Sequence, residues 1–517
     1  MTTPADHHDQ PAAAAAANPV NCDLPSGSLH RTILRRLLSR PTTVAVTDDS
    51  RSYKGIEIIV AALHVATAIE RATDKRHVGL LLPTSGATPI AALAAWMTGR
   101  VIVPLNYLLK PSELQYVVDH AGIDTIVTVQ PMLDFLDEQP KVKTLLKLDE
   151  MNFKRLPRPR IPAKRNPTDL ACLLYTSGTS GKPKGVMLTH GNVTASIHAA
   201  CKHAEFQKGD TFLGVLPQFH CFGLIVLTLV PLAIGCPVVY TARFVPSKLL
   251  RIAQKHRPSV FVAIPAMYNA LSAVKDPPSD AFTKLRYCVS GGEPLPEAVA
   301  DAFKDKFGVT INEGFGMTET SAASHWCLPQ FYKRHAVGPP LPGVAQRIVD
   351  IETGNDLPPG TDGELRLTGP MVMQGYYNDA EATAAAFDDQ GYLRTGDMAR
   401  IDEDGLCYIT GRLKEMLIVG GENVFPREIE EVLCAHEHVA AAGVVGQPDP
   451  SRGEVPIAFV EAMEGSTLDD AELIRFCRDH LAGYKVPRRV VVLEKLPRNP
   501  TGKVVRRELK AMVESTA

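Results

Sequence analysis

Short apolar runs alternate with helix-like stretches between about residues 50 and 290 of this chain. The apolar runs cover residues 77–82, 101–104, 125–129, 213–216, 237–240, 260–264 and 287–290. Helix-like stretches such as residues 52–71 and 89–97 lie between them. Strands that alternate with helices pair in parallel, and helices cover both faces of the resulting sheets. The pattern therefore predicts an α/β fold with a large N-terminal domain of parallel sheets flanked by helices.

The pattern changes after residue 344, where short strands become frequent. Residues 363–369, 392–397 and 399–412 are closely spaced strand-like runs that predict an antiparallel β region. A helix-like stretch at 427–436 and apolar runs at 439–445 and 457–462 follow. We therefore expect a disordered tail over residues 1–30 and a large domain over 31–412, whose β-rich part spans about 340–412. A small C-terminal α/β domain is expected over 413–517, and the family resemblance described below implies that this domain is mobile.

Composition narrows the functional classes. The chain has 517 residues, of which 45% are hydrophobic and 22% charged, and its net charge is −2. These values are typical of globular proteins, and no strong positive field exists to attract nucleic acid. The ten cysteines have no CxxC spacing, which argues against a zinc site or a disulfide framework. Because the N-terminus also lacks a signal-peptide pattern, we expect a cytoplasmic protein without a nucleic-acid partner.

Two segments raise the question of membrane contact. Residues 221–240 have the length of a membrane span, but Pro231, Gly235 and Pro237 interrupt them, so we expect a buried helix followed by a buried strand. Residues 151–166 carry six basic residues and three prolines. Our preferred interpretation is a solvated linker between subdomains, because most charge runs are solvated. The alternative is a patch that binds anionic lipid or an acidic carrier protein.

Residues 174–186, LYTSGTSGKPKGV, are the strongest local signal. Glycines let backbone N–H groups approach an anion closely, hydroxyls add donors, and lysines add charge. A Walker loop requires Ser or Thr after Gly-Lys, but here Pro183 follows Lys182. The segment therefore predicts a polyphosphate site of another kind, formed by Thr176, Ser177, Gly178, Thr179, Ser180, Gly181 and Lys184.

Further motifs follow this loop in a fixed order. They are PQFH at 217–220, SGGEP at 290–294, NEGFGMTE at 312–319, the segments 363–378 and 392–397, GRLKE at 411–415, GGENV at 420–424 and PRNPTGK at 497–503. The ordered set resembles the ANL superfamily of adenylate-forming enzymes, which contains acyl- and aryl-CoA synthetases, adenylation domains of peptide synthetases, and beetle luciferases. The matching region, residues 174 to 503, covers nearly two-thirds of the chain.

The resemblance implies an enzyme with two half-reactions. A carboxylate attacks the α-phosphate of ATP to give an acyl-adenylate and pyrophosphate, and a thiol, usually that of CoA, then displaces AMP. It therefore implies ATP, Mg2+ and CoA as ligands. Glu319 would hold Mg2+, which prefers oxygen ligands, and Thr318 would bond the α-phosphate. Lys503 would stabilise the charge that develops as the bond forms, and His220 would separate the acid pocket from the thiol tunnel. Taken alone, Lys503 is an exposed lysine and His220 a buried structural histidine.

The resemblance also assigns the nucleotide contacts and the hinge. Asp397 would accept hydrogen bonds from the ribose hydroxyls, assisted by Arg412. Lys414 would be the hinge about which the small domain turns between the half-reactions, bringing Gly420 and Gly421 into the site. The adenine side would be formed by Gly291, Gly292, Glu293, Glu313, Gly314, Phe315 and Gly316.

The resemblance to the ANL superfamily also narrows the class of acid that the enzyme would activate. Amino-acid-activating members carry Asp where His220 stands, so an amino acid is disfavoured. The expected pocket is apolar, which suits a fatty acid of medium to long chain or an aromatic acid. Its expected residues are Phe222, Leu224, Ile225, Ile264, Ala266, Met267 and Met317, with the small Gly291 and Gly314.

Two alternatives and two partner questions stay open. The leading hypothesis is an acyl-CoA ligase. The alternatives are a ligase that loads an acyl carrier protein and, from another class, a catalytically silent nucleotide-binding scaffold. A fatty substrate would favour peripheral contact with a membrane. The oligomeric state is not determined by the sequence.

Overall fold

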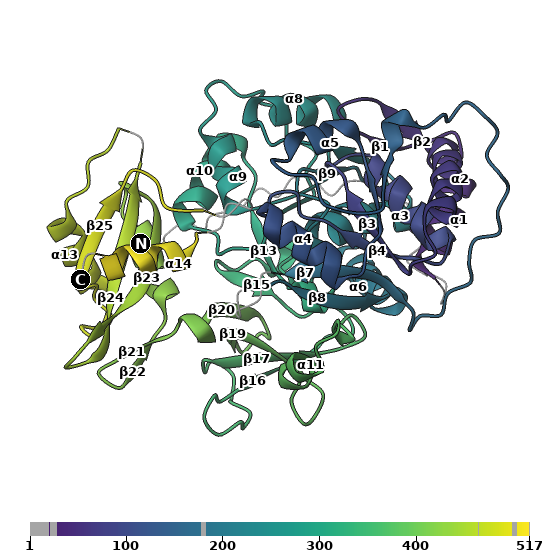
Figure 1. Ribbon diagram of the computed structural model, residues 1–517. Helices are drawn as coiled ribbons and strands as arrows, with labels where there is room; N and C mark the ends of the chain where they lie inside the picture. The colour runs from purple at the N-terminus through teal and green to yellow at the C-terminus, as the bar shows by residue number, and fades with distance from the viewer. Residues whose placement is uncertain (1–19, 21–27, 177–181, 464, 499–503, 516–517) are drawn as a thin grey trace.

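The computed structural model describes residues 20, 28–176, 182–463, 465–498 and 504–515. A large domain is followed by a β-rich region and by a small C-terminal domain, which stands apart from the large domain in Figure 1. The predicted α/β fold class is confirmed.

The first sheet has seven strands, in the order β18 (Gly375–Tyr376), β8 (Lys184–Thr189), β7 (Leu170–Thr176), β4 (Val101–Pro104), β3 (His77–Leu81), β5 (Thr125–Thr128) and β6 (Thr144–Lys147). From β7 to β6 the neighbouring strands are parallel, whereas β8 and β18 pair antiparallel. Helices α4 (Pro111–His120) and α5 (Gln130–Phe135) share a hydrophobic cluster with this sheet.

The second sheet has eight strands, in the order β14 (His325–Trp326), β13 (Asn312–Phe315), β12 (Tyr287–Ser290), β11 (Val260–Ala263), β9 (Phe212–Gly214), β10 (Val238–Tyr240), β1 (Val44–Thr47) and β2 (Ser52–Lys54). Its six inner strands are parallel, and the two edge strands pair antiparallel. Its helices include α8 (Pro246–His256), α9 (Pro265–Ser272) and α10 (Glu297–Phe307).

One hydrophobic cluster joins residues of both sheets with a further group of helices. These are α1 (Leu29–Ser39), α2 (Gly55–Ala72), α3 (Ala87–Met97), α6 (His190–Ala204), the π-helix η2 (Phe222–Leu229) and α7 (Val230–Ile234). The apolar stretch 221–240 thus forms η2, α7 and β10, as predicted. In the described part of the chain, no helix is both long and apolar enough to cross a membrane.

The N-terminal boundary needs a correction. Helix α1 begins at Leu29, and both Leu29 and His30 are buried, so the large domain starts before residue 31. Val20 is also buried, and its N–H donates to the carbonyl oxygen of Phe206 at 2.9 Å. The rest of the expected tail, residues 1–19 and 21–27, lies outside the described residues.

The predicted antiparallel region is a five-stranded sheet in the order β15 (Ala336–Gly338), β20 (Cys407–Arg412), β19 (Leu393–Ile401), β17 (Gly363–Thr368) and β16 (Ala345–Val349). Each neighbouring pair is antiparallel. Helix α11 (Ala380–Ala386) lies between β18 and β19 in the chain, and the short helices η3 (Thr318–Thr320) and η4 (Pro329–Phe331) precede the sheet.

The C-terminal domain begins after η5 (Leu413–Glu415). It contains β21 (Leu417–Val419), β22 (Glu422–Val424), α12 (Pro426–Cys434), β23 (Val439–Asp449), β24 (Gly453–Ala462), α13 (Asp470–His480), β25 (Arg489–Leu493) and α14 (Arg506–Ser515). Two hydrophobic clusters lie within it, so it has a core of its own. Arg506 pairs with Glu430 of the same domain at 2.6 Å and with Glu415 of η5 at 2.9 Å.

The basic segment 151–166 is not a linker between subdomains. It connects η1 (Leu148–Glu150), which follows β6, with β7, and both strands belong to the seven-stranded sheet. The preferred interpretation of this segment was therefore wrong.

Candidate functional site

A cavity of about 1050 Å3 opens where the carboxyl ends of β9, β11, β12 and β13 face the β-rich region and the hinge. Ligands of open parallel sheets commonly bind at this edge. The predicted site residues that line the cavity are Thr176, Lys184, His220, Gly291, Gly292, Glu293, Gly314, Phe315, Gly316, Thr318, Glu319, Arg412 and Lys414. Segments more than two hundred residues apart in the sequence are thus brought together.

Thr318 and Glu319 lie at the start of η3, directly after β13. The turn depends on Gly316, because a Cβ atom there would lie 2.1 Å from the carbonyl oxygen of Ala322. Both side chains are buried. The hydroxyl of Tyr376 donates to Oε1 of Glu319 at 2.9 Å. Burial, together with the nearby Glu319, raises the pKa of the Tyr376 phenol, so that this group stays a hydrogen-bond donor.

His220 lies in the cavity wall and its side chain is exposed to the cavity. Its Nδ1 is 3.7 Å from Sγ of the buried Cys221, and the hydroxyl of Thr318 donates to the same sulfur at 3.4 Å. The neighbouring Cys221 raises the pKa of His220 above its ordinary value. The sequence did not single out Cys221 or Tyr376, although Tyr376 lies within the matching segment 363–378.

The inner walls of the cavity are apolar. Of the residues expected there, Phe222, Ile264, Ala266, Met267, Met317, Gly291 and Gly314 line it. Leu224 and Ile225 do not; they are fully buried in the core. The structure adds Phe206, Phe212, Val215, Leu216, Val226, Val230, Val260, Val262, Val289 and Trp326.

Phe222 lines this pocket and packs closely against Gly291. A Cβ atom on Gly291 would lie 3.0 Å from Cζ of the Phe222 ring and 3.3 Å from the carbonyl oxygen of Gly314. The ring therefore rests on the glycine backbone, and any side chain at position 291 would displace it.

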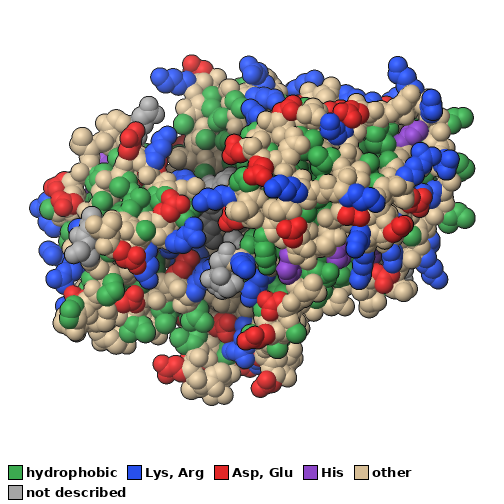
Figure 2. Space-filling view, viewed as in Figure 1, with side chains coloured by type: hydrophobic (Ala, Val, Ile, Leu, Met, Phe, Trp, Pro, Cys, Tyr) green, Lys and Arg blue, Asp and Glu red, His purple; other side chains and the backbone are tan. Residues whose placement is uncertain are grey.

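Asp397 and Arg412 face each other across the β19–β20 pair, where they are partners in the register. Nε of Arg412 donates to Oδ1 of Asp397 at 2.9 Å, and the Asp397 side chain is 2% exposed. Asp397 and Glu313 line a second cavity of about 700 Å3 between the large and C-terminal domains, where Figure 2 shows the surface to be hollowed. Burial raises the pKa of Glu313.

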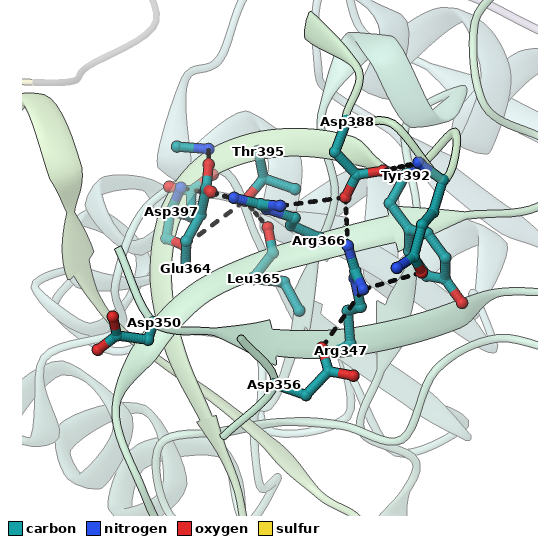
Figure 3. Close-up of polar contacts among 12 residues, drawn as sticks. Arg347, Asp350, Asp356, Glu364, Leu365, Arg366, Asp388, Tyr392, Thr395 and Asp397 are labelled. Atoms are coloured by element: carbon teal, nitrogen blue, oxygen red, sulfur yellow. Dashed lines mark hydrogen bonds and ion pairs between the residues drawn. The ribbon is translucent and has the colours of Figure 1, made fainter. Parts of the chain in front are cut away.

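A buried polar network lies beside the part of β19 that carries Asp397 (Figure 3). Arg366 on β17 donates to Glu364 at 3.0 Å and to Asp388 at 3.1 Å. Arg347 on β16 donates to the same Asp388 oxygen at 2.5 Å. Burial of the Asp388 carboxyl opposes ionisation, but the N–H of Tyr392 and the two arginines lower its pKa to about 2. The network joins β16 and β17 to the segment that leads into β19.

Thr395 and Glu364 link this network to the backbone of β19 next to Asp397. The Thr395 hydroxyl donates to the carbonyl oxygen of Leu365 at 2.6 Å and accepts from the N–H of Asp397 at 3.0 Å. Oε1 of Glu364 accepts from the N–H of Gly396 at 3.4 Å. The position of the Asp397 carboxylate is therefore set by residues of β17 as well as of β19.

Some predicted site residues are not brought to the cavities. Gly420 and Gly421 form the exposed turn between β21 and β22 and line neither cavity. Ser177, Gly178, Thr179, Ser180, Gly181 and Lys503 lie outside the described residues. The residues next to the Lys503 segment that the structure describes, Arg498 and Val504, both line the second cavity.

Comparison with known proteins is consistent with this geometry. The AMP-binding enzyme family model matches residues 35–377, and the model of the AMP-binding enzyme C-terminal domain matches residues 428–503. The chain belongs to the AMP-binding enzyme family. The predicted membership of the acyl-CoA synthetase branch of the ANL superfamily is thereby confirmed, and with it the enzyme class, an AMP-forming acid–thiol ligase.

Two curated relatives and one solved structure illustrate the range of this family. A long-chain-fatty-acid–CoA ligase of Bacillus subtilis is 31% identical over 542 residues, which cover 95% of each chain. A feruloyl-CoA synthase of Amycolatopsis sp is 33% identical over 491 residues, covering 92% of this chain and 97% of the relative. ATP-bound MatB from Rhodopseudomonas palustris superposes with a TM-score of 0.86 at 29% identity, covering 95% of this chain and 99% of that chain.

Proposed function

We propose that this enzyme is an ATP-dependent acyl-CoA ligase whose substrate is a carboxylic acid with an apolar chain that carries no second charge, with medium- to long-chain fatty acids as the first candidates. The apolar cavity carries this proposal. Between Phe206 and Met267, the described residues that line it include no Lys, Arg, Asp or Glu. Its basic residues, Lys184, Arg394, Arg412 and Lys414, come from other segments. A second charged group on the acid would therefore find no partner along the inner walls.

The acid would place its carboxylate near Thr318, beside the α-phosphate of ATP. The Thr318 hydroxyl would orient that phosphate, and Lys503 would stabilise the charge that develops as the acyl-adenylate forms and pyrophosphate leaves. His220 would close the acid pocket on the side from which the thiol arrives. Asp397 would hold the ribose together with Arg412. The buried network around Asp397 supports this role, because it fixes the position of the carboxylate.

Glu319 fits a Mg2+ ion, since it is a buried carboxylate that faces the cavity and is oriented by Tyr376. When bound, the ion would neutralise phosphate charge. The expected cytoplasmic location stays part of the proposal and is supported by the nine cysteines of the described ranges, none of which forms a disulfide.

The small domain would turn about Lys414 before the second half-reaction. The exposed position of Gly420 and Gly421, away from both cavities, fits an adenylate-forming arrangement in which this turn has not yet entered the site. The thiol of CoA would then attack the acyl carbonyl carbon and release AMP.

One reaction tests the proposal. Purified protein is mixed with ATP, Mg2+, CoA and pooled acids that include acetate, dicarboxylates, aryl acids and fatty acids, and products are read by mass spectrometry. A fatty acyl-CoA with matching AMP supports the proposal. Thioesters of dicarboxylates or acetate would refute the apolar substrate, AMP or adenylate without a CoA thioester would indicate a carrier protein as acceptor, and no turnover of any acid with ATP bound would indicate a scaffold.

A pair of variants checks that this cavity selects the acid. Phe222→Ala removes the ring that rests on Gly291 and should shift preference toward bulkier acids. Gly291→Ala adds a methyl 3.0 Å from that ring and should shift preference toward slimmer ones. If both variants keep the wild-type order of acids, the acid does not bind here.

A further inference from the structure

The basic segment 151–166 presents two apolar side chains to solvent. Leu156 is 96% exposed and Ile161 is 90% exposed. Among the described residues no other large hydrophobic side chain exceeds the 57% exposure of Leu38. Single exposed apolar residues are common on protein surfaces, but two nearly bare branched side chains five positions apart are not explained by chance exposure alone.

The segment is anchored to the large domain. The carbonyl oxygen of Arg155 is 2.9 Å from Nε2 of His64 on α2, and Arg160 forms a two-pronged ion pair with Glu70 of the same helix. Because six residues of helix separate these two anchors, they lie about 9 Å apart along α2. The N–H of Ala163 also donates to the carbonyl oxygen of Met97 at 3.0 Å.

Prolines add to this fixed geometry. Pro157, Pro159 and Pro162 restrict the backbone between and after the two anchors. Leu156 and Ile161 are each next to one of these prolines. The segment therefore holds its apolar side chains outward at a small entropic cost, which a freely solvated linker would not do.

Four cations surround these side chains. Lys154, Arg155, Arg158 and Lys164 are exposed, and within the described ranges none of them takes part in an ion pair. Figure 1 shows the segment as the long loop on the outer side of α1 and α2, and Figure 2 shows hydrophobic side chains projecting among lysines and arginines along that edge.

We propose that residues 153–164 dock this protein on the surface of an anionic phospholipid bilayer, with Leu156 and Ile161 inserted among the lipid headgroups and Lys154, Arg155, Arg158 and Lys164 on the lipid phosphates. Exposed apolar groups and unpaired cations are complementary to such a surface. Insertion of the apolar side chains and attraction of the cations to the anionic lipids both contribute to the binding free energy. An acidic carrier protein is less compatible, since a carrier docked here would sit at the end of the molecule opposite the interdomain cavity.

Vesicle co-sedimentation of the full chain tests this docking, which does not depend on the identity of the acid. The probes are vesicles of phosphatidylcholine alone and of equimolar phosphatidylcholine and phosphatidylglycerol. We expect binding to the mixed vesicles that weakens as salt is added, and much weaker binding to phosphatidylcholine. Leu156→Ser with Ile161→Ser should lower the partition coefficient about tenfold or more.

Matched variants separate the parts of the surface. Replacing Lys154, Arg155, Arg158 and Lys164 by Gln should abolish the preference for phosphatidylglycerol. Ile418→Ser with Val492→Ser removes two exposed apolar side chains from the C-terminal domain and should leave binding unchanged. Circular dichroism and the ligase rate with a soluble acid check that each variant is folded.

Three results would overturn the docking. They are no sedimentation of the wild-type chain with mixed vesicles, equal loss of binding in the control pair, and sedimentation unaffected by the patch variants. Binding of an acidic carrier protein that the patch variants abolish, with vesicle binding intact, would overturn it in favour of a protein partner.

Discussion

The Asp388 carboxyl should be the most costly single charge to remove from the β-rich region. It accepts hydrogen bonds from Arg347 and Arg366 and its side chain is 4% exposed. Its pKa is lowered from 3.8 to about 2, and this difference corresponds to about 2 kcal/mol of folded-state stabilisation. In Asp388→Asn both arginines lose a partner, but Arg366 keeps Glu364 and Arg347 keeps Asp356. We therefore expect a cost of about 2 to 4 kcal/mol, near the low end of the range for broken buried pairs.

Hydrogen exchange measured by mass spectrometry is the suitable assay, because a chain with several domains does not unfold in one step. A loss of about 2 kcal/mol makes local opening about thirtyfold more frequent, so peptides that cover β17 and β19 should exchange about thirtyfold faster. Peptides from β23 and β24 should not change. Asp389→Asn is the matched control, since Asp389 is adjacent and exposed.

The pH dependence follows from the sign of the pKa change. A carboxyl whose pKa is lowered by folding stabilises the folded state above its ordinary pKa and loses that contribution as pH falls from 3.8 toward 2. The difference between wild type and Asp388→Asn should therefore stay constant between about pH 5 and pH 8. Exchange within threefold of the Asp389 control, or a difference that changes across this pH range, would refute the reasoning.

Three further outcomes are expected for the site. Lys503→Ala should lower adenylate formation by about a hundredfold or more while a supplied acyl-adenylate still yields thioester, and equal loss in both assays would contradict its role. Lys414→Pro should preserve pyrophosphate release and slow thioester formation, because the hinge could no longer rotate; unchanged rates in both would rule out the hinge. Tyr376→Phe removes the donor to Glu319 and should raise the Mg2+ concentration needed for half-maximal pyrophosphate release about tenfold, whereas an unchanged requirement would separate Glu319 from the metal.

Most of the parallel-sheet strands could be located from the sequence because they are short, apolar and bounded by breaks. Residues 101–104 and 287–290 match β4 and β12 in full, and the other five strands predicted for the parallel sheets match to within one or two residues. In the C-terminal domain, β23 and β24 each extend four residues beyond the predicted runs. The motif residues could be assigned to one site through the resemblance to the ANL superfamily. The structure brings them together because the carboxyl ends of neighbouring parallel strands meet at the same sheet edge. Gly420 and Gly421 lie apart from both cavities. The sequence implied this position only indirectly, through the expected rotation of the small domain about Lys414.

The walls of the acid pocket could not be predicted fully, for a geometric reason. Residues 222–229 form a π-helix, in which hydrogen bonds join residues five apart and side-chain spacing differs from that of an α-helix. Phe222 and Val226 therefore line the cavity, while Leu224 and Ile225 are buried in the core. The network around Asp388 was equally hidden, because Arg347, Arg366 and Asp388 lie about twenty residues apart in the sequence and meet only in the folded β-rich region.

The position of the proposed docking surface is compatible with the domain rotation that the proposed reaction requires. The segment 151–166 lies beside α2, whereas the C-terminal domain lies at the other end of the molecule (Figure 1). Docking at α2 would therefore leave the small domain free to turn between the half-reactions. It follows that the rates of adenylate and thioester formation with a soluble acid should be the same on vesicles as in solution. A selective loss of thioester formation on vesicles would instead place the C-terminal domain against the bilayer and contradict docking through this segment.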